Sequence, residues 1–111
     1  MDKLIHYQHL IKQFMSEFAN LANQPPSQGS EMMCLFDDEH QQYALLKVGW
    51  TKLGRLHHTS LHVHLSEDKI WVEEDWTEEG IAHYLRKHGV PKEELVLAFH
   101  PPEWRGYSES V

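Results

Sequence analysis

The sequence predicts an α+β fold: a mainly antiparallel sheet of about five strands, with an N-terminal helix and a second helix before the last strand. Apolar residues recur at spacings of three and four over residues 3–23 and 76–88, which is the helical period. Short segments between and after them alternate apolar and polar residues, which is the strand period. Short turns join the first four strand segments, so their pairing is expected to be antiparallel.

The first helix is predicted over residues 3–23, with Asp2 as its N-cap. The Pro25-Pro26 pair ends it, because proline lacks the N–H donor and clashes with the preceding turn. The apolar stripe consists of Leu4, Tyr7, Ile11, Phe14, Phe18 and Leu21. Leu10 and Met15 widen it enough for two contact surfaces, so we expect a homo-oligomer as well as packing on the sheet.

A first hairpin is predicted from strands 31–37 and 42–50 around a polar turn. The second strand is apolar on both faces, which indicates a central position or a second covered surface. A second hairpin, from 55–65 and 69–74, closes at Glu67-Asp68. The favoured register pairs the following residues: Leu65 with Ile70, Val63 with Val72, His64 with Trp71 and His62 with Glu73.

The second helix is predicted over residues 76–88, capped by Asp75 with Glu78 at the capping-box spacing. Gly89 stands where a helix needs a left-handed residue after its end. A last short strand contains Leu95, Leu97 and Phe99, and the prolines that follow end it. We expect one domain over residues 1–111.

Composition narrows the class of protein. The net charge of −7 weighs against duplex DNA as a direct partner and suits a basic protein partner. The single Cys34 permits no internal disulfide, and neither a signal peptide nor a membrane-spanning run is present, so we expect a cytoplasmic protein. No phosphate loop, dinucleotide fingerprint or catalytic motif occurs, so neither an enzyme nor a cofactor is expected.

Two groups of residues are candidate sites. Alternate residues of a strand share a face, so His58, His62 and His64, with Glu73 across the hairpin, are candidate zinc or nickel ligands. Their separation of about 6.5–7 Å along the strand makes a solvated or interface face with a His62–Glu73 pair the favoured alternative. The tail contains Pro101, Pro102, Trp104 and Arg105, which either pack on the domain or form a docking surface for a partner.

A set of short motifs runs in order along most of the chain: Val48-Gly49-Trp50, Lys69-Ile70-Trp71-Val72, Asp75-x-Thr77-Glu78-x-Gly80-Ile81-Ala82, Gly89-Val90-Pro91, Leu95-Val96-Leu97-Ala98-Phe99, and Pro101-Pro102 with Arg105. This ordered set resembles the XisI family, the fdxN element excision controlling factors of cyanobacteria. The sequence departs from the family in its His-rich strand at 57–64, in its loop at 24–30 and in its last five residues.

The resemblance implies a role in excising a DNA element during heterocyst differentiation, beside a site-specific recombinase or an XisH-like protein of endonuclease fold. It implies no catalytic residues. The hypothesis is therefore a non-catalytic controlling factor that binds a nuclease-like or recombinase partner, in the manner of an antitoxin. The alternatives are a direct DNA-binding accessory factor and a metal-dependent enzyme that uses the His-rich face.

Overall fold

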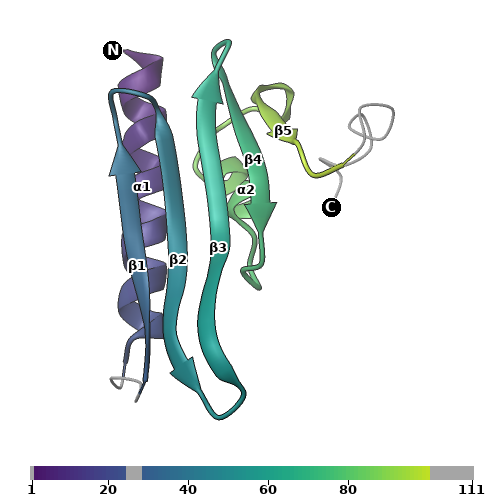
Figure 1. Ribbon diagram of the computed structural model, residues 1–111. Coiled ribbons are helices and arrows are strands. Elements are labelled where there is room, and N and C mark those ends of the chain that lie inside the picture. Colours follow the sequence, from purple (N-terminus) through teal and green to yellow (C-terminus); the bar gives the residue numbers. More distant parts are fainter. Residues whose placement is uncertain (1, 25–28, 101–111) are drawn as a thin grey trace.

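The computed structural model describes residues 2–24 and 29–100 (Figure 1). Helix α1 is followed by four strands, a short helix, a 3₁₀ turn and a last strand. The elements in chain order are α1 (Lys3–Ala22), β1 (Ser30–Asp37), β2 (Gln42–Thr51), β3 (Gly54–Ser66), β4 (Lys69–Asp75), α2 (Ile81–Lys87), η1 (Lys92–Glu94) and β5 (Leu95–Leu97). The predicted α+β fold is confirmed. Among the described residues no helix is long and apolar enough to cross a membrane.

The five strands form one sheet in the order of the sequence, β1-β2-β3-β4-β5. The first four are antiparallel to their neighbours, as short turns between them require. Strand β5 is parallel to β4, because α2 carries the chain back along the sheet before β5 begins. Both helices lie on the same side of the sheet, so the described residues leave the other side uncovered; we call it the open face (Figure 1).

Helix α1 packs on the sheet through the predicted stripe. Asp2 caps it by accepting a hydrogen bond from the Leu4 amide at 3.0 Å. Leu21 is the exception in the stripe, since its side chain is 73% exposed. The core lies between α1, α2 and the covered sheet face. Its fully buried side chains include Ile11, Met15, Tyr43, Leu45, Leu61, Val63, Ile70, Val72, Ile81 and Leu85.

The β3–β4 hairpin closes at Glu67-Asp68, as predicted. Both residues have positive φ, 56° and 61°, as a type I′ turn requires. The predicted pairs Leu65–Ile70, Val63–Val72 and His64–Trp71 are confirmed. The predicted pairing of His62 with Glu73 is wrong, because the register shifts after Val63 and His62 stands opposite Glu74.

A second irregularity lies in β3 at Ser60. Leu61 pairs with Leu45 and Thr59 with Leu46, so Ser60 bulges out of the pairing with β2. The Ser60 carbonyl accepts a hydrogen bond from the Trp76 amide at 2.8 Å. A bulge inserts one residue and thereby reverses the alternation of side chains. His58 is therefore turned to the face opposite His62 and His64.

The second helix is shorter than predicted. It begins at Ile81 rather than at residue 76, with Gly80 at its N-cap position. The Asp75 carboxylate does bind the first helical amide, that of Ile81 at 2.8 Å, but it does so across a five-residue loop. Gly89 has φ 95° and follows the C-cap residue His88, so the predicted helix end is confirmed.

Candidate functional site

The histidines on β3 are not gathered into one group. The Nε2 atom of His64 lies 2.7 Å from a Glu73 carboxylate oxygen, and the ring of His64 stacks on Trp71. His62 instead lies 2.9 Å from the Gln42 side chain, in the neighbouring strand β2. His58 contacts the Thr59 carbonyl, on the other face of the sheet.

The predicted metal ligands His58, His62, His64 and Glu73 are thus split by the bulge at Ser60 and by the register shift beside Glu73. Only His64 and Glu73 make a direct contact with each other. Within residues 2–24 and 29–100, no group of three or more His, Cys, Asp or Glu side chains lies close enough to hold a metal ion. The arrangement favours a His64–Glu73 pair on the sheet surface.

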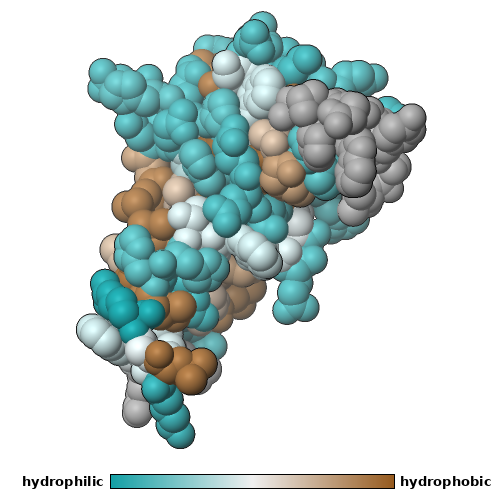
Figure 2. Space-filling model, turned by 45° about the vertical axis from the view of Figure 1, so that its right-hand side comes forward, coloured by the Kyte–Doolittle hydropathy of each residue, from teal (hydrophilic) through white to brown (hydrophobic). Residues whose placement is uncertain are grey.

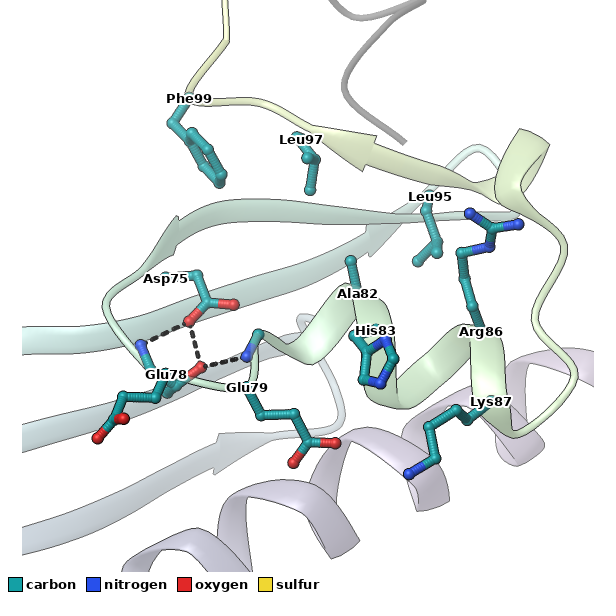
Figure 3. Close-up of a pocket in the computed structure, with 12 residues that line it drawn as sticks. Asp75, Glu78, Glu79, Ala82, His83, Arg86, Lys87, Leu95, Leu97 and Phe99 are labelled. Atoms are coloured by element: carbon teal, nitrogen blue, oxygen red, sulfur yellow. Dashed lines mark hydrogen bonds between the residues drawn. The ribbon is translucent and has the colours of Figure 1, made fainter. Parts of the chain in front are cut away.

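A groove of about 810 Å³ lies between α2 and β5 (Figure 3). Its wall is apolar where α2 faces β5 and charged at both ends of the helix. The apolar lining consists of Ala82, Leu95, Leu97 and Phe99. The polar and charged lining includes Asp75, Glu78 and Glu79 before the helix, and His83, Arg86 and Lys87 within it. Phe99 is 48% exposed, which is unusual for a large apolar side chain.

The loop that leads into the groove is fixed by Asp75. One carboxylate oxygen accepts hydrogen bonds from the Thr77 amide at 2.8 Å and the Thr77 hydroxyl at 2.5 Å. The other oxygen accepts from the Ile81 amide. Thr77 in turn accepts from the Gly80 amide, and Figure 3 shows part of this network. These bonds engage both oxygens of Asp75, so the residue holds the loop in place.

The sequence had pointed to the tail at this end of the molecule rather than to the groove. Pro101, Pro102, Trp104 and Arg105 lie outside the described residues, which end at His100. The groove is bordered by Phe99, immediately before that tail. The alternation of Leu95, Leu97 and Phe99 signalled a strand, but no sequence pattern shows that Leu95 and Leu97 are buried whereas Phe99 is left 48% exposed beside α2.

The open face of the sheet is a second uncovered surface. Its β1–β2 half is apolar and its β3–β4 half carries His62, His64 and Trp71. The apolar half consists of Met33, Leu35, Ala44, Leu46 and Val48, with Met33 38% and Leu35 49% exposed. Figure 2 shows hydrophobic side chains gathered on the left and in the lower part of that view, below a hydrophilic upper end. It is the second apolar face that the sequence of β2 indicated, and the described residues leave it uncovered.

The fold and these surfaces define an α+β protein whose helices cover one face of a five-stranded sheet and leave the other face open. Comparison with known families and structures identifies it further. The XisI protein family matches the chain over residues 1–111, so the chain belongs to the XisI family. The resemblance of the sequence motifs to that family is therefore confirmed. No curated protein matches the chain.

Two crystal structures from Anabaena variabilis are similar to it. The first, a XisI-like protein, has a TM-score of 0.85 and 30% identity, over 96% of this chain and 95% of that one. The second, the fdxN element excision controlling factor XisI, has a TM-score of 0.82 and 33% identity, over 95% of this chain and 100% of that one. The second protein is described as a controlling factor rather than as an enzyme.

Proposed function

We propose that this chain is a non-catalytic controlling factor for excision of a DNA element, and that it acts by binding a nuclease-like protein or a site-specific recombinase. The observation that carries the proposal is the whole-length match to the XisI family, together with 33% identity to an fdxN element excision controlling factor. The XisH-like proteins of endonuclease fold are the first partners to test.

The groove between α2 and β5 is the surface through which the partner is bound. Its apolar lining offers a pocket for an apolar or aromatic anchor, the kind of contact that dominates protein interfaces. Glu78 and Glu79 lie at one end and Arg86 and Lys87 at the other, so the rim can fix the orientation of the partner by charge. The tail residues Pro101, Pro102, Trp104 and Arg105 come two to six positions after Phe99 in the sequence and are proposed as further partner contacts.

The charge of the chain supports an inhibitory mode of binding. A net charge of −7 is unsuited to a phosphate backbone and complements the basic surface with which a nuclease holds nucleic acid. An acidic domain seated on that surface excludes the substrate, as an antitoxin does. Association of this kind is fast at low ionic strength and slows as salt screens the charges.

The test is co-purification of the chain with a tagged XisH-like protein and, in parallel, with a tagged recombinase, at about 50 mM salt, where charge attraction is little screened. We expect one of them to retain the wild-type chain. Phe99→Asp in the groove should release it. Leu21→Asp is the matched control, since Leu21 is 73% exposed on α1, away from the groove. Equal retention of both variants would remove the groove as the binding surface. Retention by neither partner would remove the proposed function.

A further inference from the structure

Charge is strongly segregated along this chain. Residues 40–66, which contain β2, its turn and β3, have no aspartate or glutamate, although the chain has 17 acidic residues. The same segment contains three basic residues, Lys47, Lys52 and Arg55. A segment of this length in an acidic protein is expected to carry several carboxylates. Their absence distinguishes the surface of this segment from the acidic remainder of the chain.

The fold places opposite charges at opposite ends of the sheet. The β1–β2 turn and the β3–β4 turn lie side by side, joined by a hydrogen bond from the Leu65 amide to the Gln41 carbonyl. We call these two turns, residues 37–41 and 67–68, the acidic end. The turn from Thr51 to Gly54, with Arg55, lies at the other end, and we call it the basic tip (Figure 1). The ten residues of β2 separate the two by about 34 Å.

The acidic end has exposed carboxylates that can form ion pairs with a partner. Lys12 binds Asp38 at 2.8 Å, and His40 lies 2.9 Å from Asp37. Glu39, Glu67 and Asp68 are exposed, and within the described ranges none of the three has an ion-pair partner. At the basic tip Lys52 is exposed, and Arg55 lies over the ring of Trp50, which is itself 64% exposed.

We propose that the open sheet face binds a second copy of this chain in an antiparallel two-fold dimer. With the two-fold axis running across the strands, the apolar β1–β2 half of one copy meets the same half of the other. The same rotation places the basic tip of each copy against the acidic end of its partner. One symmetric contact thus buries the apolar β1–β2 half of both copies. It also pairs opposite charges at both ends of the interface.

The surface is large enough for such a dimer. Strands β1, β2 and β3, with 8, 10 and 13 residues, cover a flat area of about 34 by 14 Å, roughly 500 Å². Side chains make the real surface larger than this projection. A biological interface buries at least about 1,000 Å² in total, roughly 500 Å² from each partner. The open face of β1 to β3, with the exposed Trp50 beside it, meets this requirement.

A second copy fits these residues better than nucleic acid does. DNA-binding proteins that depend on phosphate contacts use roughly six to ten of them, and the acid-free segment has only three lysines and arginines. Phosphates would also leave Met33, Leu35 and Val48 without apolar partners. In addition, the net charge of −7 opposes self-association, and a surface poor in acids is where that repulsion is weakest.

The first experiment is sedimentation velocity of the full chain at about 50 mM salt, over a range of micromolar concentrations. We expect a dimer. Leu35→Asp, within the apolar β1–β2 half of the open face, should weaken the dimer at least tenfold. Leu21→Asp on α1 should leave it unchanged. A wild-type chain that stays monomeric at 100 μM, or a Leu35→Asp variant that dimerises as well as the wild type, would overturn the proposal.

The second experiment tests the antiparallel arrangement by exchanging charges. Lys52→Glu with Arg55→Glu reverses the basic tip, and Glu39→Lys with Glu67→Lys reverses the acidic end. Each double variant alone should dimerise at least tenfold more weakly, because like charges meet at both ends. An equimolar mixture of the two should form a heterodimer, since both of its ends then pair opposite charges. A mixture that stays monomeric overturns the arrangement, as does a dimer that forms only when duplex DNA is added.

Discussion

The Asp75 carboxylate is the single side chain whose removal should most disturb the groove. It accepts three hydrogen bonds, two from Thr77 and one from the first amide of α2, and so joins the end of β4 to the start of the helix. A hydrogen bond to a charged group contributes about 1.5–3 kcal/mol, less where water can replace it. Asp75 is half-buried, so we expect Asp75→Ala to cost about 2–4 kcal/mol in the free energy of unfolding.

The measurement is urea unfolding followed by tryptophan fluorescence, with the free energy taken from the midpoint and slope. Glu78→Ala is the matched control, because the sequence assigned Glu78 to a capping box with Asp75. The hydrogen bonds that fix this loop come from Asp75 and Thr77. Glu78→Ala should therefore change the free energy of unfolding by less than about 0.5 kcal/mol. Equal losses for Asp75→Ala and Glu78→Ala, or a loss below about 1 kcal/mol for Asp75→Ala, would refute the reasoning.

Three further predictions concern stability and reactivity. Gly49→Ala should destabilise by about 3 kcal/mol or more in thermal or urea unfolding, because φ is +148° and a Cβ would lie 1.8 Å from a backbone oxygen. Gly54→Ala, with open space around it, should cost only about 1–2 kcal/mol. The hydrogen bond from Tyr7 lowers the pKa of Glu94, so wild-type stability should exceed that of Tyr7→Phe at neutral pH, and the difference should shrink as pH falls through that lowered pKa. Burial raises the pKa of the Cys34 thiol, so a thiol reagent at pH 8 should modify it more slowly than in urea-unfolded protein; equal rates would contradict this.

Elements that are periodic in sequence were predictable. Helix α1 and the two hairpins follow from the spacing of apolar residues and from turn residues, since burial on one face imposes that spacing. The Leu65–Ile70 and Val63–Val72 pairs were found because any other register would mix polar and apolar sets. Family membership was also accessible, because the motifs occur in order along the chain.

The errors share one physical cause, which is that bulges and loop networks leave no periodic signal. The bulge at Ser60 reverses the facing of His58, and the shift beside Glu73 gives that carboxylate to His64 instead of His62. A bulge is fixed by backbone geometry, here including a hydrogen bond from the Trp76 amide, and not by the type of side chain. The late start of α2 likewise goes with a loop held by hydrogen bonds from Thr77 and Ile81 to Asp75, which no apolar periodicity signals.

The two uncovered surfaces lie on different sides of the molecule, and this has a consequence for binding. The groove belongs to the α2 side of the sheet, and the proposed dimer contact belongs to the open side. A dimer of this kind therefore presents two grooves at once. A partner that is itself dimeric would engage both, and the second contact would form at a high effective concentration.

Binding to a dimeric partner should accordingly depend on both surfaces. Leu35→Asp leaves every groove residue in place, yet it should weaken binding to a dimeric partner by at least tenfold, because the second contact is lost. Binding to a monomeric form of the same partner should be unchanged. Surface plasmon resonance with the partner immobilised at low density measures both cases. Equal affinity of Leu35→Asp and wild type for the dimeric partner would show that each groove acts alone, since the gain from two linked contacts would then be absent.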